Sequence, residues 1–506
     1  MLGIMRPLLL LSGLLAPLLI LSPVQAATSL RPDLQTLPAV PHFSVAGAAA
    51  ARALQQRPAP RRNGQPPRFA AGVALPLQLA DGRWDRLDDG SWSWRVRVGS
   101  AGARLLNFRF DQFRLPPSGR LYVYDAQGQL VQGPYTRASQ TPEGMLWTAV
   151  VEGSEAVIEL RVADAERSQV RLALGAVFHG FQSFAEAVAE TGLSGGSAAS
   201  CEVNVACPAG ASWSNEIRSA AVYTVQDNSN PLLPAEFICS GDLVNNARQD
   251  NTPYFLTAHH CQVGWNSNSP ASSMVVYWNY QASSCDGTTG SLADTQSGAT
   301  FDATDAGSDF NLLTLGAIPA GYNVHYAGID ASGNVPTSGV GIHHPKGDIK
   351  KISTYSSPAS AVSIDLCIGT LPVVGTCTQT QTIQAWQVNW SQGITEDGSS
   401  GSALWDQNHR IVGVLSGGSS ACGASSPDVY GRLAVAWTAA GTGGSLAHWL
   451  DPDNSGTRSF DGRDAGGATG GTGAGLGGGG GGGNAAALLL LLPLAWLRRR
   501  RNARRA

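Results

Sequence analysis

The chain has 506 residues, 43% of them hydrophobic and only 14% charged, so it can build a large core and is too long for one ordinary domain. Its 61 glycines and 13 tryptophans favour a loop-rich β protein over a helical one. The net charge of -3 hides an asymmetry, because residues 27–195 carry +3 and residues 196–462 carry -13, which argues against a nucleic-acid partner. An acidic surface either steers basic substrates or simply keeps the protein soluble.

The N-terminus, residues 1–26, reads as a secretory signal peptide. Arg6 supplies the positive start, Pro7 to Leu21 the apolar stretch, and Val24 to Ala26 a small-x-small cleavage site. Three prolines in and around this stretch argue against a buried helix. We therefore expect an exported protein, in a compartment where disulfides persist.

Residues 27–68 are rich in Pro, Ala and Arg and predict a flexible lead, and residues 69–195 predict a β-rich domain. Alternating runs separated by turn sequences predict a small β-sandwich up to Gly180. Four such runs are Trp92 to Val98, Leu105 to Phe110, Leu121 to Tyr124 and Ala156 to Val162. Phe181 to Glu190 is a candidate amphipathic helix, and Gly192 to Ser200 is a linker of small residues.

Every cysteine of the chain follows this linker. The eight are Cys201, Cys207, Cys239, Cys261, Cys285, Cys367, Cys377 and Cys422. An even number in one segment, behind a signal peptide, predicts four disulfides. A zinc site is the alternative, but no pair has the Cys-x2-Cys spacing that most zinc sites use. We therefore expect no metal, and no glycine-rich phosphate loop before a helix indicates a nucleotide cofactor.

Acyl transfer needs a nucleophile, a base and a group that orients the base. Thr257 to Cys261 resembles the Thr-Ala-x-His-Cys motif of chymotrypsin-like proteases, and this resemblance makes His260, not His259, the base. Gly398 to Ser402 resembles the Gly-x-Ser-Gly loop around the nucleophile of the same class. The resemblance makes Ser400 the nucleophile and assigns the oxyanion hole to the backbone N–H groups of Gly398 and Ser400.

An aspartate between the two motifs completes a predicted triad. Asp309 leads into the apolar run Phe310 to Leu313, where a buried carboxylate is costly unless it is paired. The second ring nitrogen of His260 would supply that partner. Asp302 and Asp305 are rivals, but neither leads into an apolar run. The chain order His, Asp, Ser is that of the double β-barrel proteases.

A closer resemblance then appears over residues 200–462. Thr257 to Cys261, Val275 to Tyr280, Ile342 to Pro345 and Asp428 to Arg432 resemble bacterial lysyl endopeptidases. The resemblance implies an all-β, trypsin-like double β-barrel over residues 196–462, acting on protein and peptide substrates after lysine. It also implies the disulfides Cys201–Cys422, Cys207–Cys285 and Cys239–Cys261. Cys367 and Cys377 have no counterpart in the family, and their spacing suits a local loop disulfide.

Specificity for a basic side chain requires a carboxylate in the pocket. Trypsin's aspartate lies six residues before its nucleophile, where this chain has Ile394, whereas Asp428 matches the aspartate that lysyl endopeptidases use instead. A solvated turn aspartate is the alternative. The backbone of Ser416, Gly417 and Gly418 would align the substrate.

One position departs from the family. Some lysyl endopeptidases have a histidine in place of Ser416, stacked on a tryptophan that matches Trp390, and here only the tryptophan remains. This departure leaves the Lys-over-Arg preference open. The chain's three lysines, Lys346, Lys350 and Lys351, agree with a lysine-cleaving enzyme, although high genomic GC content would produce the same scarcity.

The resemblance further implies a precursor whose segment before Cys201 is removed. No Lys or Arg lies between Arg171 and Cys201, so self-cleavage after a basic residue cannot act near Gly196. Either another protease cuts the linker from Gly192 to Ser200, or the first cut follows Arg171. The sandwich would serve as a folding aid or an inhibitor.

The C-terminus is a glycine-rich linker, residues 463–484, followed by an apolar and arginine-rich tail, residues 485–506. The apolar stretch is shorter than the roughly 20 residues that a spanning helix needs. Together, the glycine run, the apolar stretch and the basic end resemble the GlyGly-CTERM sorting signals of Gram-negative bacteria. That resemblance implies transient membrane attachment, removal of the tail by a rhomboid-type protease, and a secreted or cell-surface protein. A permanent anchor is the alternative.

The sequence thus predicts a secreted serine endopeptidase that cleaves after lysine. Two alternatives stay open. One is a trypsin-like protease with broader Lys/Arg specificity, and the other is an inactive protease fold that serves as a surface binding module.

Overall fold

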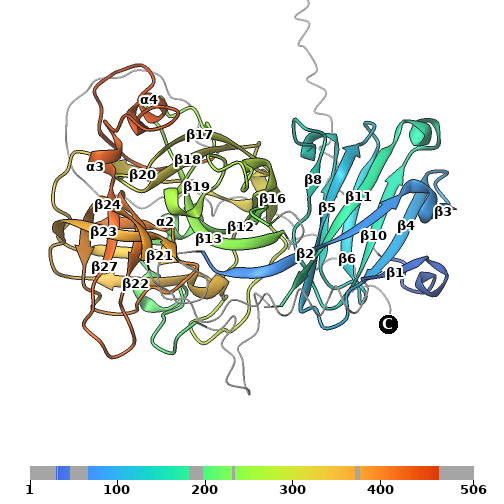
Figure 1. Cartoon of the computed structure of the whole chain (residues 1–506), viewed down its shortest axis with the longest axis horizontal. Helices are drawn as coiled ribbons and strands as arrows, with labels where there is room; N and C mark the ends of the chain where they lie inside the picture. Colours follow the sequence, from blue (N-terminus) through green and yellow to red (C-terminus); the bar gives the residue numbers. More distant parts are fainter. Residues whose placement is uncertain are drawn as a thin grey trace, which may run out of the picture. The chain divides into compact units, whose positions relative to one another are not determined.

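The computed structural model describes residues 30, 32–45, 66–181, 198–230, 234–370 and 377–465 (Figure 1). The chain divides into residues 1–467 and 468–506, and the second part lies outside the described residues. The expected signal peptide, most of the lead, the helix candidate after Phe181 and the sorting tail also lie outside them. Among the described residues, no helix has the length and apolar character needed to cross a membrane.

The prediction of an all-β fold is confirmed, because strands supply most of the regular structure in the described residues. The α-helices are short: α2 (Ser214–Ser219), α3 (Leu433–Ala436) and α4 (Leu446–Leu450). The 3-10 turns are η1 (Leu37–Ala39), η2 (Leu79–Asp81), η3 (Arg137–Ser139), η4 (Asp164–Gln169), η5 (Pro208–Gly210), η6 (His259–Cys261), η7 (Ala271–Ser273), η8 (Ala320–Tyr322) and η9 (Pro345–Gly347).

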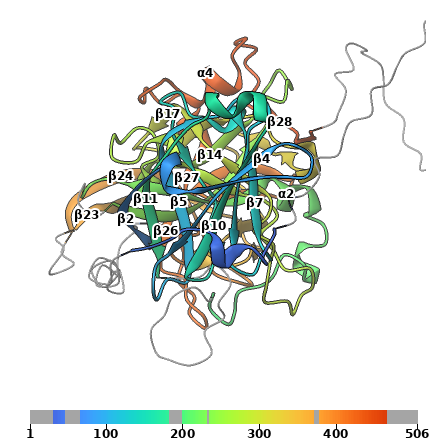
Figure 2. The same cartoon turned by 90° about the vertical axis from the view of Figure 1, so that its right-hand side faces the viewer.

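The N-terminal strands form two layers, which Figure 2 shows in blue and teal. One sheet contains β1 (His42–Ser44), β3 (Arg83–Arg86), β4 (Trp92–Gly99), β6 (Arg120–Asp125), β7 (Val131–Tyr135) and β10 (Glu155–Val162). The other layer contains β2 (Arg68–Gln78), β5 (Leu105–Arg114), β8 (Leu146–Trp147), β9 (Val151–Glu152) and β11 (Arg171–Gly180). Val96 and Ile158 from the first layer and Phe108 and Val177 from the second share one buried core. We call this region the sandwich.

The next strands build the first protease-like sheet. They are β12 (Ala220–Asp227), β13 (Ala235–Val244), β14 (Tyr254–Ala258), β15 (Val275–Tyr277), β16 (Thr295–Ser297), β17 (Ala299–Asp305) and β18 (Phe310–Leu315). Strand β2 of the sandwich pairs with β13, so both regions share a 12-stranded sheet.

The last strands build the second sheet and a small two-stranded one. They are β19 (His325–Tyr326), β20 (Gly328–Asp330), β21 (Gly339–His343), β22 (Lys351–Tyr355), β23 (Ser360–Thr370), β24 (Cys377–Val388), β25 (Ala403–Asp406), β26 (Arg410–Gly418), β27 (Asp428–Arg432), β28 (Ser459–Phe460) and β29 (Arg463–Asp464). One core joins the two sheets, because Leu256 and Leu312 of the first pack in the same cluster as Ile342 and Val414 of the second. Loops at this junction carry the predicted catalytic residues.

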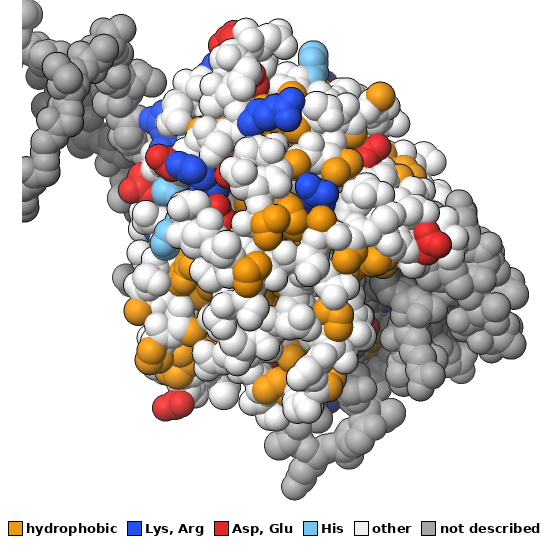
Figure 3. Space-filling model, turned by 90° about the vertical axis from the view of Figure 1, so that its left-hand side faces the viewer, with side chains coloured by type: hydrophobic (Ala, Val, Ile, Leu, Met, Phe, Trp, Pro, Cys, Tyr) orange, Lys and Arg blue, Asp and Glu red, His pale blue; other side chains and the backbone are white. Residues whose placement is uncertain are grey.

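Charge is spread thinly over the face shown in Figure 3. Side chains of both signs lie mostly in the upper half of that view, among uncharged and hydrophobic ones. The acidic excess of residues 196–462 therefore forms no dense patch on this face.

Candidate active site

His260 and Asp309 are brought together by sheet register. Strand β14 ends at Ala258, which pairs with Phe310 at the start of β18, so the residues just beyond both strand ends are neighbours. Asp309 Oδ2 lies 2.9 Å from His260 Nδ1, and Oδ1 accepts the backbone N–H of His260 at 3.0 Å. This geometry fixes the imidazole so that Nε2 points away from the carboxylate. That nitrogen is buried and has no hydrogen-bond partner among the described residues.

The Asp309 carboxyl is almost fully buried, with 3% of the residue exposed. Burial acts to raise its pKa, but the charge and hydrogen bonds of His260 and a hydrogen bond from Ser416 outweigh it and hold the pKa below the ordinary value. The backbone has φ of +53°, an uncommon conformation for a residue with a Cβ. Asp309 therefore stays ionised beside the ring that it orients.

The rival residues have other partners. His259 Nδ1 lies 2.8 Å from Thr304 Oγ1, and its ring stacks on Trp265. Asp302 accepts a hydrogen bond from Thr314, and Asp305 accepts two from Ser308. Neither carboxylate hydrogen-bonds His260 in the structure.

Contacts with the first sheet hold the backbone of Ser400 near the predicted base, although no hydrogen bond joins the Ser400 side chain to His260 Nε2. Its carbonyl accepts the backbone N–H of Ser240 at 2.8 Å, and a disulfide joins Cys239 to Cys261, the neighbour of His260. Gly401 has φ of +86°, and a Cβ there would fall on Thr257 Oγ1. The glycine of the nucleophile motif and the threonine of the histidine motif are thus in direct contact, so the two motifs form one structural unit.

The loop before Ser400 is held by a buried neutral histidine, which sequence reasoning missed. Ser353 Oγ donates to the Ile394 carbonyl at 2.6 Å, so it must accept from His343 Nε2, 3.1 Å away. His343 Nδ1 then accepts from Ser399 Oγ at 2.8 Å. Burial and the nearby Lys351 lower the pKa of His343 to about 3, so the ring stays neutral. The ring therefore ties both ends of the segment from Ile394 to Ser399 to strands β21 and β22.

Gly398, the predicted oxyanion-hole residue, lies within this loop. Its φ is +94°, a conformation that side chains disfavour, and its carbonyl accepts Ser240 Oγ–H at 2.9 Å. With its carbonyl bound in this way, the peptide units from Gly398 to Ser400 are fixed relative to β13.

Asp428 lies at the start of β27, opposite Gly418 at the end of β26. Only 1% of the residue is exposed. Its Oδ2 accepts from the Trp390 indole at 2.6 Å, from Thr395 Oγ1 at 2.8 Å and from Ser420 Oγ at 2.6 Å, and its Oδ1 accepts the Ser420 backbone N–H at 3.1 Å. All four donors are neutral, so the buried carboxylate has hydrogen bonds but no counter-charge among them. Thr395 and Ser420 carry no sequence signal, because they are two of many hydroxyls in Ser/Thr-rich loops.

The other predicted pocket residues lie around this carboxylate. Trp390 also packs edge-on against Tyr355 and Tyr430, which orients its indole towards Asp428. A Cβ at Gly418 would fall on Asp428 Oδ1, so only glycine fits there. Gly417 has φ of +155°, and Ser416, beside it, contributes the hydrogen bond to Asp309. Strand β26 therefore connects the Asp428 pocket to the His260–Asp309 pair.

The disulfides follow the pairs that the resemblance implied. Cys201 joins Cys422, Cys207 joins Cys285, and Cys239 joins Cys261. The expected Cys367–Cys377 bond lies outside the described side chains. The Cys201–Cys422 bond ties the start of the protease-like region to the loop between Gly418 and Asp428.

Known proteins match the part of the chain that holds this site. The family described as lysyl endopeptidase, C-terminal domain, matches residues 195–431. A lysyl endopeptidase from Pseudomonas aeruginosa is 27% identical over 409 residues, which cover 76% of this chain and 81% of that protein.

Solved protease structures match at lower identity. The active form of the Rv3671c protease from M. tuberculosis is 16% identical, with a TM-score of 0.29, over 48% of this chain and 89% of its own. A thermostable serine protease, AL20, from an extremophilic microorganism is 12% identical, with a TM-score of 0.29, over 43% of this chain and 92% of its own.

The chain is a serine endopeptidase. The family match begins in the linker and leaves out the sandwich. The alignment with the P. aeruginosa enzyme covers more of this chain than the residues after 195 can supply, so it extends into the region before them. The serine endopeptidase therefore shares with that relative more than its protease-like region.

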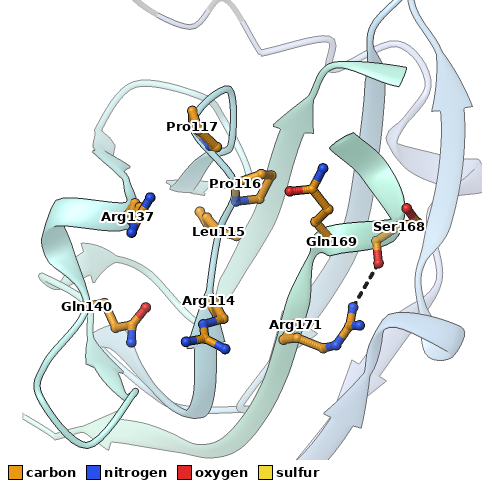
Figure 4. Close-up of a pocket in the computed structure, with 9 residues that line it drawn as sticks. All are labelled: Arg114, Leu115, Pro116, Pro117, Arg137, Gln140, Ser168, Gln169 and Arg171. Atoms are coloured by element: carbon orange, nitrogen blue, oxygen red, sulfur yellow. Dashed lines mark hydrogen bonds between the residues drawn. The ribbon is translucent and has the colours of Figure 1, made fainter. Parts of the chain in front are cut away.

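A hollow of about 640 Å³ lies on the sandwich of this endopeptidase, away from these residues (Figure 4). Arg114 on β5 and Arg171 on β11 lie side by side in it, as their cross-strand register requires, with Arg137 on the opposite wall. None of the residues that line it belongs to the predicted catalytic set. The predicted catalytic residues lie instead at the junction of the two protease-like sheets.

Proposed function

We propose that this endopeptidase cleaves peptide bonds on the carboxyl side of lysine. Ser400 is the nucleophile, His260 Nε2 takes its proton, and Asp309 orients and stabilises the resulting imidazolium. The N–H groups of Gly398 and Ser400 stabilise the tetrahedral oxyanion. His260 then protonates the leaving amine, and water hydrolyses the acyl-enzyme by the same steps in reverse order. The short distances between Asp309 and His260 support this assignment.

The buried Asp428 carboxylate is the single observation that carries the lysine specificity. A carboxylate that is removed from water and bound only by neutral donors has no counter-charge, so a cation that binds to it stabilises it strongly. Three of its four hydrogen bonds fall on Oδ2, so one more donor is best accepted on Oδ1. A compact ammonium can donate to a single oxygen, whereas a guanidinium fork is best bound by two. This arrangement favours lysine over arginine.

A panel of matched peptides tests the proposal. Each peptide carries Lys, Arg, Glu, Leu or Ala before the scissile bond, and the secreted enzyme is compared with its Ser400→Ala variant. We expect cleavage after lysine only, lost in the variant. Equal cleavage after Lys and Arg would keep the triad and overturn the lysine specificity. If enzyme that has been shown to lack the sandwich cleaves none of the peptides, the binding-module alternative is favoured.

We also propose that the sandwich is a prosegment and that the linker from Gly192 to Ser200 is where it is cut. Arg171 is the first residue of β11, a strand that pairs with both β2 and β5, and Leu172 is buried at 3% exposure. A cut after Arg171 would therefore require a central strand to open, which disfavours self-processing there. N-terminal sequencing of the secreted enzyme decides the question, because a first residue of Leu172 would contradict this proposal.

We infer export through residues 1–26 and transient membrane attachment through residues 485–506, which a rhomboid-type protease removes. The support is the sequence alone, since both segments lie outside the described residues. Intact-mass measurement of the secreted protein tests both points. A mass that retains the arginine-rich end would show that the tail is a permanent anchor.

A further inference from the structure

One edge of strand β13 runs directly past the catalytic serine. Ser240 donates its backbone N–H to the Ser400 carbonyl, and Ile238, two residues earlier, donates its N–H to the Pro67 carbonyl at 3.1 Å. Alternate residues of a strand present their backbone groups to the same edge. The sandwich residue Pro67 and the nucleophile residue Ser400 therefore occupy successive positions along one edge, about 7 Å apart by strand geometry.

Strand β2 of the sandwich continues along this edge away from Ser400. Its register is antiparallel, with Ala235 opposite Ala71, Glu236 opposite Ala70 and Phe237 opposite Arg68. Beyond Ser400, the same edge is taken by β14, which pairs with residues 242–244. Between the nucleophile and the start of β13, the sandwich thus pairs with the edge that another extended peptide could use.

This edge belongs to the leaving-group side of the scissile bond. The lysine side chain and the residues before it are assigned to Asp428 and to the backbone of Ser416 to Gly418, which lie on the second sheet. β13 lies in the first sheet, on the other side of Ser400. A substrate that extends from the pocket across the nucleophile therefore meets β13 with the residues that follow its lysine.

The contact between the sandwich and the first sheet has a buried apolar centre. Phe69, Leu105 and Trp147 of the sandwich pack in one buried cluster with Ile238 and Tyr277. Such a buried apolar contact resembles the core of an interface and holds the paired strands in place.

Polar groups at this contact are paired across it. The Trp147 indole donates to Gln226 at 2.6 Å, and Arg68 forms an ion pair with Asp227 at 3.1 Å. Asn107 donates to the buried Glu236 at 2.8 Å, and burial raises the pKa of Glu236 to about 8 despite this bond. At neutral pH the carboxyl is therefore mostly uncharged, and the free energy needed to neutralise it offsets part of what the packing and the other bonds contribute.

We propose that β2 of the uncut chain blocks the β13 edge from Ala235 to Ile238, along which the part of a substrate that follows the scissile bond would lie. The sandwich then excludes extended polypeptides while leaving the lysine pocket and the catalytic residues formed. This inference rests on the proposed protease function, which it deepens by naming how the same site is regulated.

Two lysine substrates of different length test it on the full, uncut chain. One is a capped lysine p-nitroanilide, which ends at its leaving group. The other has the same acyl side and four residues after the lysine. A tethered strand acts at an effective concentration near millimolar, so we expect the extended peptide to be cleaved at least about tenfold more slowly than by the released enzyme. The nitroanilide should be cleaved at a similar rate by both, with mass spectrometry confirming that the chain stays uncut.

Two aspartate variants of β2, one in the β13 register and one beyond it, test which part of the strand docks. Ala70→Asp places a carboxylate opposite Glu236, whereas Ala74→Asp makes the same change on the exposed part of β2 beyond the β13 register. Only Ala70→Asp should restore cleavage of the extended peptide by the uncut chain. Arg68→Ala, which removes one ion pair, is the milder second variant if Ala70→Asp fails to fold.

Several results would overturn the inference. These are equal cleavage of both substrates by the uncut wild type, cleavage of neither while the released enzyme cleaves both, or the same behaviour of Ala70→Asp and Ala74→Asp. Failure of the released enzyme on both substrates would instead contradict the proposed function.

Discussion

Asp309 and Asp428 are both buried next to the same strand, β26, yet their charges are compensated in different ways. Asp309 binds a ring that can itself carry a positive charge, so its partner is part of the chain. Asp428 binds an indole, two hydroxyls and an amide, none of which can become positive. Under the proposed function, this difference means that one carboxylate stabilises a charge made during the reaction and the other receives a charge brought by the substrate.

The largest effect should come from Asp309→Asn. The amide keeps the shape but disfavours the tautomer of His260 that accepts a proton from Ser400, so kcat should fall by about 10⁴-fold for every substrate, with little change in KM. Steady-state kinetics on the released enzyme measure this, with circular dichroism as the folding control. A loss below about tenfold would remove Asp309 from its assigned role.

Asp428→Asn should produce a smaller and selective loss. Without the buried negative charge, kcat/KM after lysine should fall by about 30-fold to a few thousand-fold, the usual range for breaking a buried charge pair. Cleavage of an activated ester of a neutral amino acid should be unchanged. If cleavage of the ester falls in parallel with cleavage of the lysine substrate, Asp428 supports the catalytic residues rather than the pocket.

Removing one hydrogen bond from each aspartate should sharpen the same contrast. Thr395→Val takes one donor from Asp428, and Ser416→Ala takes one from Asp309, each worth about 1.5–3 kcal/mol to a charged acceptor. Thr395→Val should lower kcat/KM for lysine by roughly tenfold or more and spare the neutral ester. Ser416→Ala should lower kcat on both. The measurement is the ratio, in each variant, of kcat/KM for the lysine substrate to kcat/KM for the neutral ester.

Asp302→Asn should leave activity unchanged and alter the pH dependence of stability. Burial raises the pKa of Asp302 to about 6, opposed by the hydrogen bond from Thr314, so the folded protein loses stability as pH rises from about 4 to about 6. The loss amounts to about 3 kcal/mol and should vanish in the variant. Asp309, with its lowered pKa, stabilises the fold above about pH 4 and loses that contribution only as pH falls further. Urea unfolding at several pH values measures both trends, and an unchanged profile in Asp302→Asn would contradict the first.

Sequence reasoning reached the residues with a recognisable local context. His260 and Ser400 lie in motifs, and Asp309 stands out because a carboxylate entering an apolar run needs a partner. The three disulfides that the structure shows followed from the family resemblance and not from spacing. The partners of Asp428 were out of reach, because Thr395 and Ser420 approach it only when β26 and β27 pair. The contact of β2 with β13 was equally invisible, since an exposed edge and a covered edge have the same sequence pattern.

The neutral His343 beside Ser399 bears on the proposed removal of the sandwich. Its hydrogen bonds run in one direction, from Ser399 to the ring and from the ring through Ser353 to Ile394, and they are complete while the chain is still continuous. The proposed cut in the linker would leave these three hydrogen bonds in place. A cut close to Ala199 would still reach the same loop by another route, because the Ala199 backbone N–H donates to Glu396 Oε2 at 2.7 Å.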